Sequence, residues 1–99
     1  MNQLADTLSL STTIVRAPNL AQRLFEERML IVTPRDSVLH RLNEVASALW
    51  DSLEKPQTVA DLCQVIGQRF EGFDHQKNQK DILDFLAIMK TKGLILYQN

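Results

Sequence analysis

The side chains best suited to chemistry are few in this sequence and lie far apart. The two histidines, His40 and His75, fall in different segments, each distant from the single cysteine, Cys63. Zinc and other transition metals need several such ligands to converge. Cys63 lies in an apolar stripe at helical spacing, where burial raises the pKa of a thiol and makes it unreactive. We therefore predict no metal site and a buried, inert Cys63.

The remaining candidates for catalysis have simpler structural explanations. The glycines are isolated from one another, and each suits a helix or a helix end better than a phosphate-binding loop. Asp81 and Asp84 lie about one helical turn apart, but a solvated helix face, or a local ion pair with Lys77 or Lys80, explains them better than acid–base work. We predict no catalytic residue and no cofactor, so the chain is not expected to be an enzyme.

The composition is that of one modest globular domain. Its 99 residues are 44% hydrophobic and 23% charged, and the formal net charge is −1. That charge weakens the case for nucleic acid, because phosphate neutralisation dominates such binding. A single cysteine excludes an internal disulfide, the first residues do not resemble a signal peptide, and no apolar run approaches the ~20 residues of a membrane helix. We expect a cytoplasmic protein with neither nucleic acid nor membrane as partner.

The hydrophobic pattern predicts three strands followed by three helices. Strand-like segments lie around residues 24–25, at residues 29–32 and at residues 37–42, separated by turns at residues 26–28 and 33–36. The middle segment is apolar on both faces, as expected for a central, well-covered strand. The fold class is therefore α+β, with a small three-stranded antiparallel sheet against a helical cluster. This order resembles a winged helix-turn-helix whose wing comes first.

Caps and apolar stripes define the three helices. Asn43 and Thr58 are good N-caps for the first two, the third should begin between residues 74 and 78, and Gly93 should end it. A short extended segment follows at residues 94–97. The buried stripes are expected at Ala46, Leu49, Trp50 and Leu53, then at Val59, Leu62, Cys63, Ile66 and Phe70, and finally at Ile82, Phe85, Leu86 and Met89.

The N-terminal region is treated as an arm. Residues 12–15 are β-prone, and Pro18 then interrupts the chain. We divide the sequence into an arm at residues 1–17 and a domain at residues 18–99. The β-prone patch is expected to pair with a sheet edge, either in its own chain or in a neighbour.

Several short motifs, taken together and in order, resemble the PqqD family of coenzyme PQQ synthesis protein D-like domains, which recognise precursor peptides in ribosomal peptide modification. The resemblance runs from Arg23 to Leu96. One departure is Glu54-Lys55-Pro56, where the family often has Asp-Gly. The matching motifs are the strand Met29-Leu30-Ile31-Val32-Thr33-Pro34, then Leu42-Asn43, Leu49-Trp50, Thr58-Val59-Ala60-Asp61-Leu62, Asp81-Ile82-x-x-Phe85-Leu86 and Gly93-Leu94-Ile95.

The resemblance implies a peptide-binding adaptor. Such a protein holds the leader segment of a precursor peptide and presents it to a radical SAM or other modifying enzyme, for example in pyrroloquinoline quinone biosynthesis. Two alternatives remain open. One is a DNA-binding winged helix, since lysines lie along the third helix, although Asp81 and Asp84 interrupt them. The other is a dimerising structural subunit that pairs the same edge with itself.

The predicted binding site combines a strand edge with a helix flank. In a meander the third strand lies at an edge, and its unpaired backbone groups could accept a peptide as a further strand. Alternate N–H groups should face that edge, and the sequence leaves open which ones. A pocket is expected between this strand and the third helix. The flank of the helix predicted to line it carries Leu83 and Lys90, and Ile88 lies on the opposite flank. The residues predicted to bind peptide are Val38, Leu39, His40 and Arg41 in the strand and Leu83, Ala87 and Lys90 in the helix.

Overall fold

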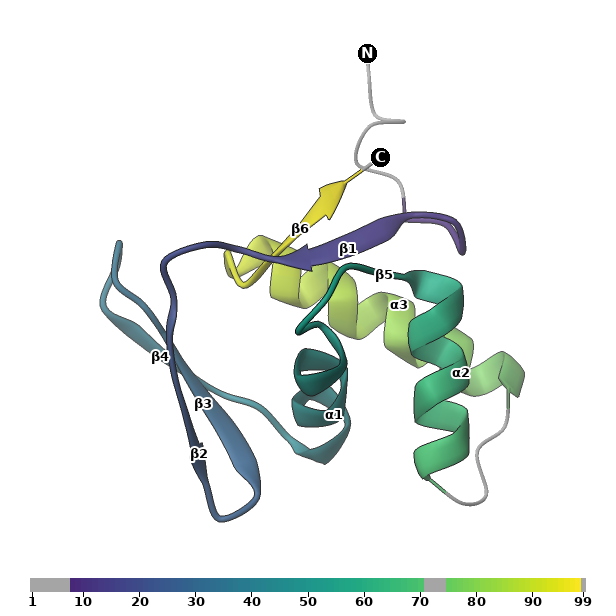
Figure 1. The fold of residues 1–99 in the computed structure, drawn as a ribbon, viewed down its shortest axis with the longest axis horizontal. Helices are drawn as coiled ribbons and strands as arrows, with labels where there is room; N and C mark the ends of the chain where they lie inside the picture. Colours follow the sequence, from purple (N-terminus) through teal and green to yellow (C-terminus); the bar gives the residue numbers. More distant parts are fainter. Residues whose placement is uncertain (1–7, 71–74, 99) are drawn as a thin grey trace.

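The fold combines three helices with two small antiparallel sheets in a computed structural model that describes residues 8–70 and 75–98, with only the backbone at residues 75–77 (Figure 1). One sheet has the strand order β5-β1-β6 and the other β2-β3-β4. The elements are β1 (Thr13–Arg16), β2 (Ala21–Phe25), β3 (Arg28–Thr33), β4 (Val38–Arg41), α1 (Glu44–Ser52), β5 (Gln57–Thr58), α2 (Val59–Arg69), α3 (His75–Thr91) and β6 (Ile95–Gln98).

The sheet β5-β1-β6 differs from the expected single sheet. β1 forms within the stretch assigned to an arm and pairs with β6, so that Ile14 lies opposite Tyr97, and with β5, where Ile14 lies opposite Gln57. Ile14 is fully buried. The β-prone patch therefore pairs within its own chain. The prediction of one sheet was wrong because β1 and β6 lie at opposite ends of the sequence, and local periodicity carries no information about such a pairing. The boundary at residue 17 stays a prediction.

The sheet β2-β3-β4 has the expected meander order, with β3 in the centre. Its coverage differs from the prediction. Ile31 and Thr33 are buried, whereas Leu30 and Val32 are only half-buried. Because side chains alternate along a strand, only one face of this sheet packs against the protein. The apolar run in β3 was therefore misread as a strand covered on both sides.

The predicted N-caps of α1 and α2 and the predicted stop after α3 are confirmed, whereas α2 ends at Arg69, before Phe70, which was expected within the helix. The Asn43 side chain accepts a hydrogen bond from the Ala46 N–H at 2.8 Å, and Thr58 Oγ1 accepts one from the Asp61 N–H at 3.1 Å. After α3, Gly93 has a φ of 80°, a conformation that glycine adopts without steric cost. Gly72, expected to stop the second helix, lies outside the described residues.

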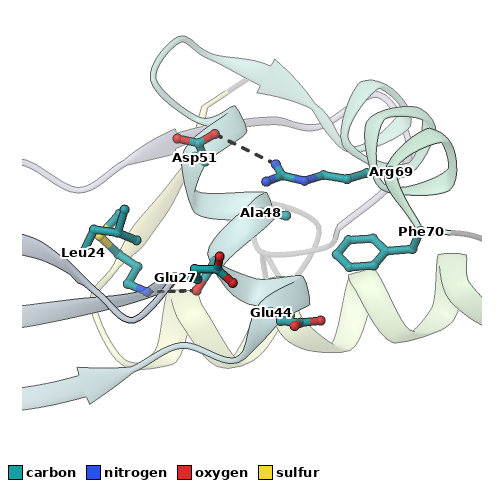
Figure 2. A pocket seen from close by; sticks show the side chains of 9 residues that line it. Leu24, Glu27, Glu44, Ala48, Asp51, Arg69 and Phe70 are labelled. Atoms are coloured by element: carbon teal, nitrogen blue, oxygen red, sulfur yellow. Dashed lines mark hydrogen bonds and ion pairs between the residues drawn. The ribbon is translucent and has the colours of Figure 1, made fainter.

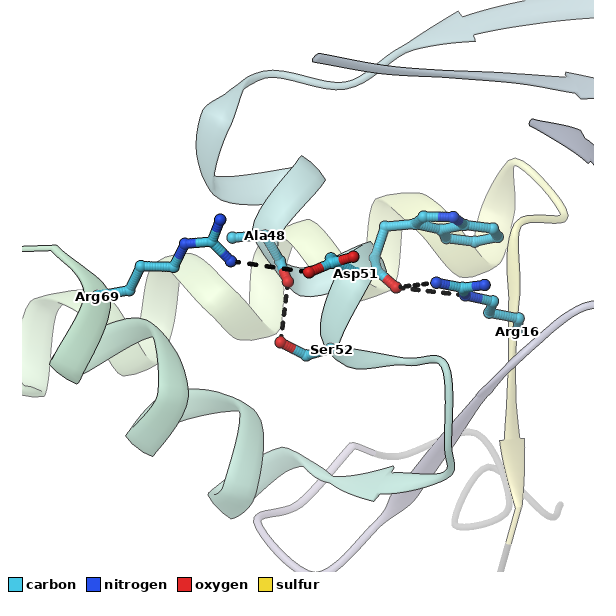
Figure 3. A network of polar contacts seen from close by, with 6 residues as sticks. Arg16, Ala48, Asp51, Ser52 and Arg69 are labelled. Atoms are coloured by element: carbon cyan, nitrogen blue, oxygen red, sulfur yellow. Dashed lines mark hydrogen bonds and ion pairs between the residues drawn. The ribbon is translucent and has the colours of Figure 1, made fainter. Parts of the chain in front are cut away.

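The core confirms most of the predicted stripes. Trp50 is 1% exposed and joins the two sheets. Its indole Nε1 donates to Gln22 Oε1 of β2 at 2.6 Å. Its carbonyl accepts two bonds from the Arg16 guanidinium of β1, at 2.7 and 3.2 Å (Figure 3). The guanidinium also lies over the indole ring, 4.6 Å from its centroid. Trp50 therefore fixes both sheets to α1. The stripe residues that are half-buried rather than buried are Cys63, Phe70 and Phe85.

No helix in the described part of the chain is long and apolar enough to cross a membrane.

Candidate peptide-binding site

No strand among residues 8–70 and 75–98 pairs with the outer edge of β4, which carries backbone groups at alternate residues. In the β3–β4 register Ile31 lies opposite His40 and Leu30 opposite Arg41. One register step further, the Leu42 N–H donates to the Met29 carbonyl at 3.0 Å. Because peptide groups alternate in direction along an antiparallel strand, His40 faces β3. The N–H and C=O groups of Leu39 and Arg41 consequently face the open edge, which resolves the parity that the sequence left open.

A polar cluster in the β3–β4 turn holds the start of β4. Thr33 Oγ1 donates to Asp36 Oδ1 and lies 3.2 Å from His40 Nε2. Asp36 Oδ1 also accepts a hydrogen bond from the Val38 N–H at 3.2 Å. The hydrogen bond from Thr33 is the main cause that lowers the pKa of Asp36, because it stabilises the ionised carboxylate. These bonds occupy the Val38 N–H, so Val38 is not a donor toward the open edge.

A second cluster holds the other end of β4. Ser47 of α1 accepts a hydrogen bond from the Met29 N–H at 3.0 Å and donates to the Leu42 carbonyl at 3.2 Å. In an uninterrupted ladder Met29 would donate directly to Leu42. The serine hydroxyl is therefore inserted between the two strands, and it fixes the point where the chain leaves β4 and enters α1.

A groove lies between β4 and α3, as predicted. Its volume is about 180 Å³. Most of the α3 side of its wall is apolar: Met89 is 3% exposed, whereas Ile88 is 51% exposed. The lining residues are His40, Arg41, Leu42, Asn43, Ala46, Phe85, Ile88, Met89, Lys92 and Leu94. An apolar groove of this kind, beside an open strand edge, suits an extended peptide with apolar side chains.

The structure brings together only part of the predicted site. His40 and Arg41 line the groove. Leu83, Ala87 and Lys90 are not among its lining residues, because the opposite flank of α3, which carries Ile88, faces β4. Lys90 instead lies over the Tyr97 ring of β6, with its Nζ 4.8 Å from the centroid. The position of β6 decides which flank is free, and no local pattern in α3 reveals it. The binding role of these residues stays a prediction, as does that of Val38 and Leu39.

Sequence reasoning did not foresee a larger hollow between the β2–β3 hairpin, α1 and the end of α2 (Figure 2). It has a volume of about 520 Å³. Arg69 reaches from α2 toward Asp51, with Nη1 4.0 Å from Oδ2, but both side chains are more than half exposed. Such surface pairs contribute little to stability. The lining residues are Leu24, Glu27, Met29, Glu44, Ser47, Ala48, Asp51, Arg69 and Phe70.

The residues considered for chemistry lie apart in the structure. Among the described residues no three or more His, Cys, Asp and Glu side chains come together as a metal site would require. Cys63 is half-buried, not fully buried as predicted. Burial still raises the pKa of its thiol, which disfavours the reactive thiolate. Its predicted lack of reactivity is not tested by the structure.

Comparison with known proteins identifies the family. The model of coenzyme PQQ synthesis protein D (PqqD) matches residues 28–95, more than half of the chain. The chain belongs to the PqqD family. The predicted resemblance, placed between Arg23 and Leu96, is therefore confirmed. No sequence among the curated proteins matches the chain.

A solved structure has the same fold as this PqqD-family protein. It is the solution NMR structure of the PqqD truncation of Methylobacterium extorquens PqqCD, with a TM-score of 0.74 and 22% sequence identity. The match covers 91% of this chain and 95% of that one. That protein is described as a functional and stand-alone recognition element for ribosomally synthesized and post-translationally modified peptides. The likeness establishes the PqqD fold for the present chain.

Proposed function

We propose that this PqqD-family protein is a non-catalytic adaptor that binds the leader segment of a ribosomally made precursor peptide. The observation that carries the proposal is the open edge of β4 beside the apolar groove on α3. The family membership supports it, as does the recognition role described for the Methylobacterium extorquens protein. Binding alone is the proposed activity, and the chemistry belongs to a partner enzyme.

The peptide would add to the sheet as a fourth strand. The N–H groups of Leu39 and Arg41 would donate to it and their carbonyls would accept, each bond contributing about 0.5–1.5 kcal/mol. Alternate peptide side chains would enter the groove against Phe85, Ile88 and Met89. Apolar burial there contributes about 25 cal/mol per Å², from which the cost of ordering the peptide is subtracted. Backbone bonds would then give general affinity, and the groove would give selectivity.

The bound peptide would be presented to a radical SAM or other peptide-modifying enzyme in the cytoplasm, with pyrroloquinoline quinone synthesis as one such pathway. In this proposal β2-β3-β4 is the wing of a winged helix-turn-helix, placed before α1, α2 and α3. Pairing of two β4 edges would instead give a homodimer. Sedimentation at several protein concentrations would distinguish that homodimer from a monomer.

The test is a calorimetric titration with leader peptides encoded beside the gene. We expect binding in the sub-millimolar to micromolar range, and no turnover of the peptide. Ile88→Asp should weaken it at least roughly tenfold, which corresponds to about 1.4 kcal/mol, because a charge would replace an exposed apolar contact in the groove. Flat heats with every candidate peptide would contradict the proposal.

A substitution on another helix provides the matched control. Ala60 is an exposed residue of α2 that does not line the groove. Ala60→Asp introduces the same charge away from the groove and should leave the affinity within about twofold of the parent, a difference of less than about 0.5 kcal/mol. Equal losses from the two substitutions would argue against the Ile88 flank as the binding surface.

A further inference from the structure

The sheet β2-β3-β4 has an outward face of distinctive composition. Cross-strand partners point to the same side of a sheet, so the register separates the face that packs on α1 from the face that points away from it. Ile31 and His40 belong to the packed face. The outward face is formed by Ala21, Arg23, Phe25, Arg28, Leu30, Val32, Leu39 and Arg41. It combines arginine with apolar residues and has no lysine, aspartate or glutamate.

Arginines are interspersed with apolar side chains on this face. Arg23, Leu30 and Arg41 form one cross-strand row, and Arg28 lies opposite Phe25 near the hairpin end. Phe25 is 55% exposed. In Figure 1 the sheet lies at the left end of the molecule, with all three helices to its right. Six of the eight residues of this face are exposed, and Leu30 and Val32 are half-buried.

The arginines of this face have no ion pair within the described part of the chain. Arg23, Arg28 and Arg41 are all exposed, and none of them lies within ion-pair distance of a carboxylate in the described part of the chain. A shallow hollow of about 340 Å³, lined by Phe25, Glu26, Arg28, Leu30 and Arg41, adjoins the hairpin end. Protein interfaces are enriched in arginine and aromatic residues and depleted of lysine and acidic residues. The outward face has that composition.

We propose that the outward face of β2-β3-β4 docks an acidic, partly apolar surface of the peptide-modifying enzyme. This inference rests on the proposed function, which supplies such an enzyme as partner. The guanidinium groups complement carboxylates, and the apolar side chains between them match an apolar patch. A peptide strand added to β4 would extend the same face. The enzyme would then contact Arg41 and the outward side chains of its substrate together.

The apolar content favours a protein over nucleic acid as the occupant. A phosphate backbone would pair with the arginines but would leave Phe25, Leu30 and Leu39 facing water. The chain as a whole carries a net charge of −1, which opposes general attraction to polyanions. An acidic protein surface can satisfy both kinds of side chain.

The experiment measures binding of the purified modifying enzyme encoded beside the gene, by biolayer interferometry, to the parent and to Arg23→Glu/Arg28→Glu. These positions lie on β2 and β3, away from the β4 edge, so leader-peptide affinity should stay within twofold. Enzyme affinity should fall at least tenfold, and the parent's affinity should weaken as ionic strength rises. The neutral variant Arg23→Gln/Arg28→Gln should show an intermediate loss.

The control reverses the same number of arginines elsewhere. Arg35 lies in the β3–β4 turn and Arg69 at the end of α2, and both are exposed. Arg35→Glu/Arg69→Glu should keep enzyme affinity within twofold. The docking proposal is overturned if both charge-reversal variants bind the enzyme alike, whether strongly or not at all. It is also overturned if the parent binds a single-stranded DNA 20-mer and Arg23→Glu/Arg28→Glu does not. If the parent does not bind the leader peptide, that result would instead contradict the proposed function.

Discussion

The two sheets each have three strands but differ in their relation to the core. In β5-β1-β6, Ile14 and Ile95 are fully buried. In β2-β3-β4, Ile31 of the central strand is also fully buried, but every residue of β2 and all but one of β4 are exposed. Trp50 joins the two through Arg16 and Gln22. The comparison indicates that β5-β1-β6 contributes core residues from both β1 and β6, whereas β2-β3-β4 reaches the core through its central strand and leaves its outer strands largely exposed.

The largest expected difference between the sheets concerns Ile14 and Leu39. Ile14→Ala should lower the free energy of unfolding by about 2–5 kcal/mol, because it opens a cavity beside the helices. Leu39 is 59% exposed, so Leu39→Ala should change stability by no more than about 0.5 kcal/mol. Urea denaturation of both variants measures the contrast. Equal effects would mean that Ile14 of β1 and Leu39 of β4 contribute equally to the free energy of unfolding.

Proline substitutions along β4 test whether the sheet β2-β3-β4 can lose a backbone N–H donor without unfolding of the domain. His40→Pro removes the donor to the Ile31 carbonyl in the ladder and should cost at least about 1–3 kcal/mol. Leu39→Pro and Arg41→Pro remove donors that face the open edge, so these variants should fold and bind leader peptide more weakly. Val38→Pro removes the bond to Asp36 and should destabilise the turn. Circular dichroism melts and peptide titrations would decide, and folded Leu39→Pro with parental affinity would exclude strand addition at this edge.

Ser47→Ala tests how the sheet β2-β3-β4 is attached to α1. Ser47 is 8% exposed, and its removal leaves the Met29 N–H and the Leu42 carbonyl without their bridge. We expect a loss of about 1–3 kcal/mol in the free energy of unfolding. Ser52 also bonds within α1, to the Ala48 carbonyl, but it bridges no strands, so Ser52→Ala is the control and should cost less. A Ser47→Ala variant as stable as the parent would show that the bridge is dispensable.

The smallest expected effect is a gain in stability at the β2–β3 hairpin. Glu26 and Glu27 have φ values of 50° and 67°, a left-handed conformation that favours Asn-Gly in two-residue hairpin turns. Glu26→Asn/Glu27→Gly should raise the free energy of unfolding by about 1 kcal/mol, since backbone strain at the left-handed φ values is relieved. Glu26→Gln/Glu27→Gln removes the same charges but keeps the strain, and should show no such gain. If the two variants melt alike, charge rather than backbone conformation is responsible.

The sequence predicted the features that depend on neighbouring residues. Asn43, Thr58 and Gly93 identified helix ends, because caps act within a few residues. The pairing of β1 with β6 and the free flank of α3 were missed, because both depend on segments distant in the chain. The parity of β4 and the outward face required the strand register. That register comes from hydrogen bonds between strands, and the types of residue in either strand do not fix it.

The antiparallel pairing of the first and last described strands has a consequence for protein architecture. Thr13 of β1 lies opposite Gln98 of β6, so the start of the first described strand lies beside the end of the last one. Units whose ends lie together are readily fused, inserted into a host protein or circularly permuted. A single short tether at this point could therefore connect the domain to an enzyme without crossing the β4 edge. The same geometry allows the two ends to be joined by a linker, with new ends opened in a surface turn, provided that Leu10 and Thr12, whose carbonyls accept hydrogen bonds from α2, are kept.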